Sequence, residues 1–229
     1  MDALARADAL SAYAAETAGC VRCALSETRN RVVFGSGDPD ADLMLVGEAP
    51  GFQEDQGGAP NVGQAGELLE RLLAGIGLRR DDVYLANVLK CRPPQNRDPL
   101  ESEIVSCEPH LFRQVELVRP RVVATLGNFA TKLLSGRPYG ITRVHGQEHE
   151  VALGATTVVL FPLYHPAAAL YTPSMLRALE DDFSRLPALL GRERPSVAAS
   201  DPAVPAEAPA SVVEDEVALA GTTIQLGLF

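Results

Sequence analysis

DLMLVGEAPG, residues 42–51, joins a short apolar run to a turn rich in glycine and proline. Four consecutive apolar residues bounded by turn residues are typical of a buried β-strand. The turn places Glu48 directly after this strand. In an open parallel sheet, ligands bind outside the carboxyl ends of the strands, so the turn is a candidate binding site.

Short apolar runs alternate with helical patterns on both sides of this segment, from about residue 20 to residue 190. Further strands are predicted over 83–89, 121–127 and 157–165. Helices are predicted over 63–77, 100–118, 128–136 and 172–186. The alternation predicts an α/β fold with a mostly parallel central sheet that helices cover on both faces.

Polar residues stand at the ends of several predicted strands. Glu48 follows the first strand, Asn87 ends the second, and His165 precedes Pro166 at the end of the last. Taken singly, each has an ordinary explanation: a solvated or helix-capping glutamate, an asparagine that fastens a loop, or a satisfied histidine. Because the carboxyl ends of parallel strands meet at one edge of the sheet, the three together predict a pocket.

The four cysteines form two groups. Cys20 and Cys23 are a C-x2-C pair, and Cys91 and Cys107 are separated by fifteen residues. Four thiolates in paired groups suit either a tetrahedral zinc ion or an iron–sulfur cluster, and their spacing does not separate the two. Four unrelated buried thiols are the third interpretation.

The segment around Cys91, KCRPPQNRDP (90–99), is rich in proline and in positive charge. Its basic residues Lys90, Arg92 and Arg97 are candidates for contacts with DNA phosphates. The alternative is an ordinary solvated loop. Any DNA contact must come from such a local patch, because the whole chain carries a formal charge of −10.

Composition and charge narrow the cellular setting. The chain has neither a signal-peptide pattern nor an apolar run long enough to cross a bilayer, and four cysteines are too few for a disulfide scaffold. We therefore expect a cytoplasmic protein with reduced thiols and no membrane contact. Every lysine and arginine lies before Pro195, and the acidic, Ala/Pro-rich stretch 191–224 predicts a disordered linker after a domain over 1–190.

Several of these motifs together resemble the family 4 uracil-DNA glycosylases, the iron–sulfur type. The resemblance covers about residues 12–188, in the order and spacing of the family. It is carried by the C-x2-C pair, GEAPG (47–51) with Glu54-Asp55, G-x-x-x-VG-x-AG (58–66), N-x-x-KCRPP (87–94), Cys107, TLGNFA (125–130) and FPLYHPAAAL (161–170).

The resemblance implies a three-layer α/β/α sandwich and a monofunctional DNA-repair hydrolase. Such an enzyme flips deoxyuridine out of DNA and hydrolyses its N-glycosidic bond, which releases uracil and leaves an abasic site. Gly47, Glu48 and Ala49 match the motif that faces uracil, and its glutamate is implicated in positioning the attacking water. Asn87 matches the asparagine that reads the pyrimidine edge, and His165 matches the histidine that meets uracil O2.

The resemblance also implies a cofactor and exposes one departure from the family. Its implied ligands for a 4Fe-4S cluster are Cys20, Cys23, Cys91 and Cys107. The family pattern G-x-P-F-V-G reads GAPNVG here, so Asn61 stands where a phenylalanine usually stacks on uracil. Base–aromatic stacking is worth about 1–3 kcal/mol, so Asn61 motivates an alternative hypothesis, a catalytically weak iron–sulfur protein that binds DNA or recruits partners.

The last five residues, QLGLF (225–229), return to large apolar side chains after the acidic linker. They resemble the Q-L-x-L-F peptide with which bacterial repair and replication proteins dock on the DNA polymerase sliding clamp. The matching residues are Gln225, Leu226, Leu228 and Phe229. We therefore expect a monomer whose partners are uracil-containing DNA, single- or double-stranded, and the sliding clamp.

Overall fold

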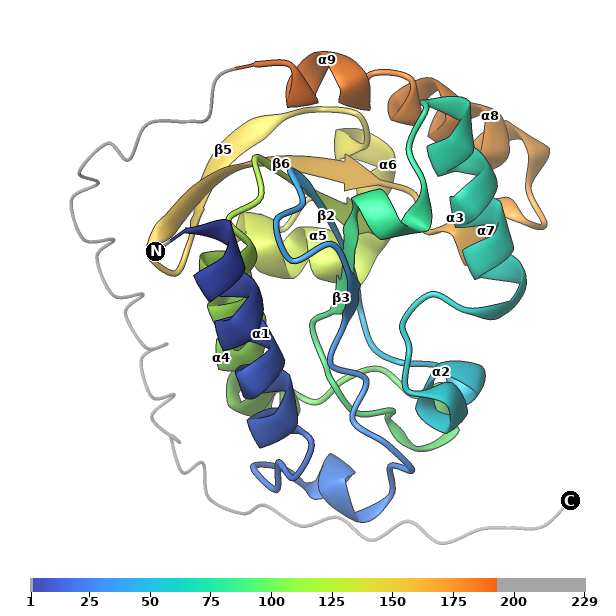
Figure 1. The fold of residues 1–229 in the computed structure, drawn as a ribbon. Coiled ribbons are helices and arrows are strands. Elements are labelled where there is room, and N and C mark those ends of the chain that lie inside the picture. The colour runs from blue at the N-terminus through green and yellow to red at the C-terminus, as the bar shows by residue number, and fades with distance from the viewer. Residues whose placement is uncertain (1, 193–229) are drawn as a thin grey trace, which may run out of the picture. The chain divides into compact units, whose positions relative to one another are not determined.

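The computed structural model describes residues 2–192, and within them one sheet has the strand order β1-β3-β2-β4-β6-β5 (Figure 1). The strands are β1 (Ser36–Gly37), β2 (Leu43–Gly47), β3 (Tyr84–Asn87), β4 (Val122–Leu126), β5 (His149–Leu153) and β6 (Thr156–Leu163). The four central strands run parallel, whereas the edge strands β1 and β5 are antiparallel to their neighbours. The predicted mostly parallel sheet is confirmed.

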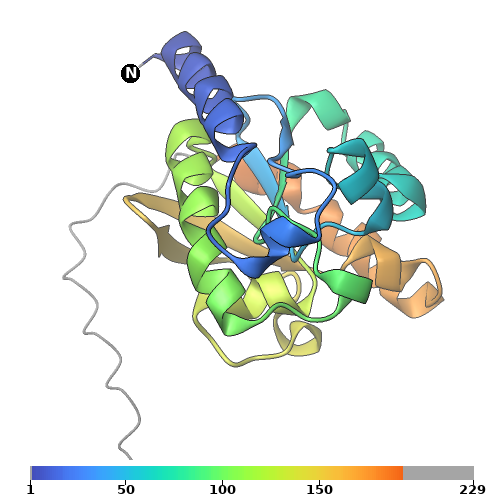
Figure 2. The ribbon, with the colours of Figure 1, turned by 90° about the horizontal axis from the view of Figure 1, so that it is seen from below.

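Helices cover both faces of the sheet, as Figures 1 and 2 show. One face packs against α1 (Ala3–Thr17), α4 (Glu101–Val118) and α5 (Asn128–Ser135). The other face packs against α3 (Gly63–Gly75), α7 (Pro166–Ala169), α8 (Pro173–Phe183) and α9 (Leu186–Leu190). The connections contain α2 (Phe52–Gly57), α6 (Ile141–Val144) and 3-10 turns at Ala24–Glu27, Arg80–Asp82 and Pro94–Asn96. The predicted α/β/α sandwich is therefore present.

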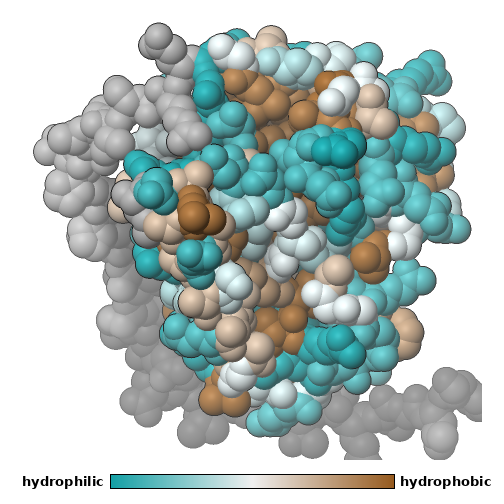
Figure 3. All heavy atoms as spheres, in the orientation of Figure 1, coloured by the Kyte–Doolittle hydropathy of each residue, from teal (hydrophilic) through white to brown (hydrophobic). Residues whose placement is uncertain are grey.

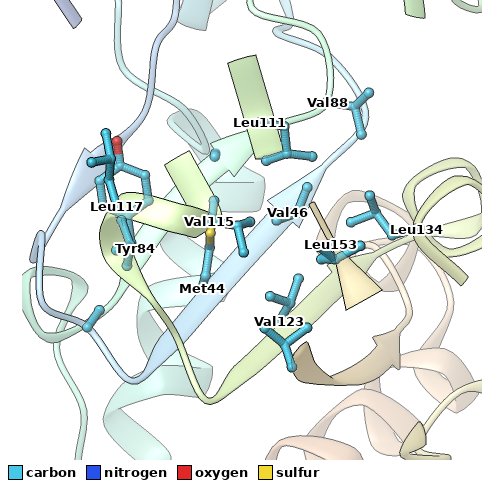
Figure 4. Packing of buried hydrophobic residues seen from close by; sticks show 14 of the residues in the cluster. Met44, Val46, Tyr84, Val88, Leu111, Val115, Leu117, Val123, Leu134 and Leu153 are labelled. Carbon is cyan, nitrogen blue, oxygen red and sulfur yellow. The ribbon is translucent and has the colours of Figure 1, made fainter. Parts of the chain in front are cut away.

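The alternation of side chains along β2 divides the core into two layers. Met44 and Val46 point to the α4 side, where they pack with Val115 (Figure 4), whereas Leu43 and Leu45 pack on the α3 side. Every residue of β2 is buried, which explains its continuous apolar sequence. Burying one such side chain contributes about 1.5–3 kcal/mol, so these layers hold the strand ends in fixed positions.

The remaining sequence-based expectations have different outcomes. The helix predicted over 63–77 is present as α3, and its apolar face, formed by Leu68, Leu69, Leu72 and Leu73, is buried. No helix within residues 2–192 is long and apolar enough to cross a membrane, and the face drawn in Figure 3 mixes hydrophilic and hydrophobic residues. The predicted linker, apart from its first two residues, and the predicted clamp peptide lie outside the described residues.

Candidate active site

A cleft of about 350 Å³ opens at the carboxyl ends of β2, β3 and β6. The sheet register explains its position, because the last residues of β2 and β3, Gly47 and Asn87, lie side by side. Its lining contains most of the site residues expected from the sequence: Glu48, Ala49, Asn61, Asn87 and His165. Pro50, Phe52, Glu54, Asn96 and Arg97 also contribute to its wall.

Asn87 presents an amide group whose nitrogen finds no partner among residues 2–192. Only 4% of the residue is exposed, and its Nδ2 atom is buried without a hydrogen bond. Gly47 makes room for this side chain, because a Cβ atom on Gly47 would lie 2.4 Å from Asn87 Oδ1. Leaving a buried donor unsatisfied costs about 1–3 kcal/mol, so Nδ2 is a ready site for an acceptor atom on a ligand.

Glu48 lies between the cleft and a neighbouring cavity of about 580 Å³, which it shares with His165, Asp98 and Lys132. Burial raises the pKa of Glu48, and the negative charge of Asp98 raises it further. The backbone carbonyl of Glu48 accepts a hydrogen bond from Leu89 N at 3.0 Å, which fixes the turn. This arrangement leaves a half-buried carboxylate at the rim of the cleft, where it can accept hydrogen bonds from water.

His165 is held in one tautomer by the start of α7. Its Nδ1 atom accepts a hydrogen bond from Ala167 N at 3.1 Å, so the proton of the neutral ring lies on Nε2. Burial lowers the pKa of His165, which favours this neutral form. Gly127, with φ of +91°, allows the end of β4 to approach closely, since a Cβ atom there would lie 3.2 Å from His165 Cβ. His165 therefore offers an N–H donor rather than a full positive charge.

Asn61 provides a second unpartnered amide in the cleft. Its φ of +52° is left-handed, a conformation that asparagine tolerates better than most residues. Its backbone N–H donates to the Glu54 carboxylate, and its carbonyl accepts from Arg80 Nη1 at 2.8 Å. The side chain is buried, and Nδ2 has no hydrogen-bond partner within residues 2–192. The backbone is thus fixed while the amide donor remains available.

Lys90 was expected to contact DNA, but the structure buries it, and this prediction is wrong. Its side chain is fully buried, and its ammonium group donates to the Asn87 carbonyl at 2.7 Å and to Gln114 Oε1 at 2.5 Å. Burial lowers its pKa to about 8. Lys90 therefore ties the end of β3 to α4 and is not accessible to a phosphate.

The other two basic residues of this loop differ in their availability. Arg92 donates to Asn96 Oδ1 at 2.7 Å and lies over the ring of Phe52, and it forms no ion pair within residues 2–192. Arg97 is exposed but forms a two-pronged ion pair with the buried carboxylate of Glu103, at 2.9 and 2.6 Å. Arg92 thus keeps its charge available, whereas much of the charge of Arg97 is neutralised.

The four cysteines line one small cavity. Cys20 and Cys23 lie in the turn after α1, Cys91 follows β3, and Cys107 lies in α4. Segments far apart in the sequence are thus brought together here by the packing of α1 on α4. The structure confirms the sequence-based position of Cys91 just past a strand and of Cys107 within a helix.

The surroundings of these thiols suit thiolate ligands. Arg29 Nη1 donates to Cys91 Sγ at 3.6 Å, and the N–H of Lys90 donates to Cys107 Sγ at 3.2 Å. Burial raises the pKa of Cys91 to about 11 and also raises that of Cys107, so thiolates here require compensating positive charge. Bound metal supplies such charge, and N–H···S hydrogen bonds are a common feature of iron–sulfur sites.

The arrangement of these residues bears on the choice between zinc and a cluster. Within residues 2–192, no group of three or more His, Cys, Asp or Glu side chains is placed to hold one metal ion. Zinc needs four ligands that converge on one point, whereas a cuboidal cluster takes one thiolate at each of its separated iron atoms. Four thiols around one cavity supply donors of the kind that either site requires.

Sequence reasoning missed two charged residues of the cavity beside the cleft, Asp98 and Lys132. Asp98 lies in the proline-rich loop, and Lys132 lies one turn into α5 from the TLGNFA motif. Neither belongs to a local pattern that predicts chemistry. Only the packing of the loop and of α5 around the strand ends brings them to Glu48.

Comparisons with known proteins bear on the family to which this chain belongs. Residues 34–186 match the family model of the Uracil DNA glycosylase superfamily. The chain is 43% identical over 184 residues to the Type-4 uracil-DNA glycosylase of Sulfurisphaera tokodaii, which covers 78% of this chain and 84% of the relative. It is 44% identical over 186 residues to that of Archaeoglobus fulgidus, with 80% and 94% covered. For Saccharolobus solfataricus the identity is 44% over 184 residues, with 78% and 85% covered.

These matches extend over the strands that carry the cleft. The family model includes β2, β3, β4 and β6 and every predicted uracil-site residue, as well as Cys91 and Cys107. Similarity at this level over more than three quarters of the chain exceeds what a shared fold alone requires. The chain belongs to the type-4 uracil-DNA glycosylases.

Proposed function

We propose that this protein flips deoxyuridine out of DNA and hydrolyses its N-glycosidic bond, releasing uracil and leaving an abasic site for base excision repair. The observation that carries this proposal is the unpartnered amide of Asn87, buried beside Glu48 and His165 at the strand ends. Identity to the curated glycosylases does not favour the alternative of a catalytically weak recruitment protein.

Asn87 reads the edge of the flipped base in this proposal. Its Nδ2 donates to uracil O4, and its Oδ1 accepts from N3–H. Cytosine carries the reverse pattern, a donor at position 4 and an acceptor at N3, so it would leave both amide atoms opposed. The buried position of the amide strengthens this discrimination, because an unpaired polar group there has no access to water.

His165 stabilises the leaving group. Cleavage of the glycosidic bond leaves negative charge on the uracil ring, with O2 as a main carrier. The Nε2–H of neutral His165 donates to that oxygen, and the hydrogen bond from Ala167 N keeps the ring in the required tautomer. A prepositioned donor of this kind contributes most when charge develops in the transition state.

Glu48 orients the attacking water. An ionised carboxylate accepts hydrogen bonds only, so it can position a water molecule and counter the positive charge that develops on the sugar. Its position at the junction of the cleft and the neighbouring cavity gives it access to both base and solvent. Ala49 and the Gly47 backbone complete the wall of the base pocket, and Asn61 faces the base from the opposite loop.

We further propose that Cys20, Cys23, Cys91 and Cys107 hold a 4Fe-4S cluster. When bound, such a cluster supplies a rigid cross-link between α1, the loop after β3 and α4. The loop after Cys91 carries Arg92, the unpaired arginine that we assign to a DNA phosphate, with Arg97 as a weaker candidate. Anchored at Cys91 in this way, the loop would be held in place for that contact.

The C-terminal segments have a separate role in this proposal. Residues 1–190 form the glycosylase domain, 191–224 a linker, and Gln225, Leu226, Leu228 and Phe229 the peptide that binds the sliding clamp. We also propose that the protein acts as a monomer in the cytoplasm. Deletion of residues 225–229 is expected to abolish a pull-down with the clamp while excision from short oligonucleotides is unchanged. Retained clamp binding by the truncated protein would contradict this role.

An excision assay tests the proposed reaction. The purified protein is incubated with labelled oligonucleotides that contain one uracil or, as the control, one cytosine, and abasic sites are then cleaved with alkali. A strand product is expected only from the uracil substrate. Absence of product at stoichiometric protein would refute the proposal.

A further inference from the structure

A cavity of about 210 Å³ borders a different face of α5 from the one that lines the active site. It lies among α5, α6 and the first residue of β5. We call it the arginine cavity, and its polar lining includes Ser135, Arg137, Tyr139, Arg143, Gln147 and His149. Among the residues that the structure describes, no carboxylate contributes to this lining.

The charges of the arginine cavity are not compensated. Within residues 2–192, neither Arg137 nor Arg143 forms an ion pair, and Arg143 lies 4.4 Å from the centre of the Tyr139 ring, which holds it in place. The Nε2 atom of His149 is buried and has no hydrogen-bond partner in the described part of the chain. Two guanidinium groups without an ion pair and a ring nitrogen without a hydrogen bond thus line one concave site. Such a site indicates a negatively charged ligand with several acceptor atoms.

The arginine cavity is coupled structurally to the active site. Asn128 begins α5 and lines the cavity next to Glu48 and His165. Its Oδ1 accepts a hydrogen bond at 3.0 Å from the N–H of Ile141, the first residue of α6, and α6 also contains Arg143. The segment that carries the arginines is therefore fastened to the rim of the proposed base pocket.

We infer that the arginine cavity binds a backbone phosphate of the DNA that flanks the flipped nucleotide, an inference that rests on the proposed function. An arginine fork matches the two free oxygens of a phosphodiester, and such contacts position a protein on DNA without reading its sequence. A protein with a formal charge of −10 needs local sites of this kind to hold a polyanion.

The salt dependence of DNA binding tests this inference. Each phosphate contact contributes about 0.9 to the slope of log K against log salt. We expect Arg137→Ala and Arg143→Ala each to lower the slope for an undamaged duplex by about 0.9, and to weaken binding roughly tenfold at about 0.1 M salt. Arg143→Lys should keep the slope, because the charge is retained. Arg119→Ala is the matched control, since this exposed arginine precedes β4 at the opposite end of the sheet.

Two further arms separate the sources of the phosphate and the causes of failure. Inorganic phosphate should not raise the melting temperature of the wild-type protein more than that of Arg143→Ala, because the expected ligand is the DNA backbone. Unchanged salt slopes in both alanine variants would overturn the inference. If, in addition, phosphate stabilised the wild-type protein more than Arg143→Ala, the arginine cavity would be assigned to a free anion instead. Binding to undamaged DNA involves no excision, so this test does not depend on the proposed reaction. If the proposed reaction is wrong, the wild-type protein will still bind DNA but will not release uracil in the excision assay.

Discussion

Gly47→Ala perturbs the proposed base pocket through a single methyl group. The new Cβ atom would lie 2.4 Å from Asn87 Oδ1, and Cβ atoms essentially never lie closer than 3.0 Å to such an atom. Because β2 and β3 are paired and buried on both sides, neither backbone can move away. The amide of Asn87 must therefore shift by at least about 0.6 Å, the difference between those two distances.

A shift of this size misaligns both hydrogen bonds that we assign to uracil O4 and N3–H. The loss of two such bonds in a buried site costs about 2–3 kcal/mol. Single-turnover excision of uracil should then fall roughly 30- to 150-fold, since each 1.36 kcal/mol is a factor of ten in rate. Stability should change less, because the strand itself is retained.

The assay is single-turnover excision from a U·G duplex, with the melting temperature as a check on folding. Gly75→Ala is the matched control, since a Cβ atom there meets nothing within 4 Å. Asn87→Ala should be as slow as Gly47→Ala, and the double variant should be no slower than either one, because both changes remove the same contacts. A Gly47→Ala rate within twofold of wild type would refute the assignment of Asn87.

The other predictions concern the remaining site residues. Asn61→Phe should raise the rate of uracil excision by up to about tenfold, because base–aromatic stacking contributes about 1–3 kcal/mol, which exceeds the strain of a phenylalanine in the left-handed conformation. An equal or lower rate would mean that the Asn61 amide has a task of its own. Glu48 must be ionised to orient water, and its pKa is raised. The excision rate should therefore fall with decreasing pH, with a midpoint above the usual glutamate pKa of about 4.3. Glu48→Gln should lose most of the rate and should no longer show this fall at low pH. His165→Ala should slow single-turnover excision by about 10²-fold or more with little loss of DNA affinity; loss of binding with an intact cleavage step would contradict its role. Cys91→Ala should give colourless, aggregation-prone protein without iron or acid-labile sulfide, and a soluble, active variant would count against the cluster.

Much of the fold could be predicted because its signals are local. Every predicted strand and helix is present. The strands β2, β3 and β4 are buried along their whole length, so their sequences are mostly apolar and stand out from their surroundings. The edge strand β5 was not predicted, because it is short, begins with two polar residues and buries only Leu153. The helix α1 was also missed, since few of its residues are buried and its apolar stripe is weak.

The candidate site could be predicted only as far as the strand-end rule reaches. That rule brings Glu48, Asn87 and His165 to one edge, as observed. The burial of Lys90 could not be predicted, because its ammonium group depends on Gln114, a residue of α4 that is distant in sequence. Likewise, no local pattern indicates that Asp98 lies near Glu48 and raises its pKa.

The central claim is that the unpartnered amide of Asn87 selects uracil in this cleft. The most direct measurement is the single-turnover excision rate of wild type and of Asn87→Ala on matched duplexes containing uracil or cytosine, with free base quantified as product. We expect wild type to release uracil and no cytosine, and Asn87→Ala to release uracil roughly 30- to 150-fold more slowly with unchanged DNA affinity. Equal rates of uracil release by the two proteins would contradict the claim.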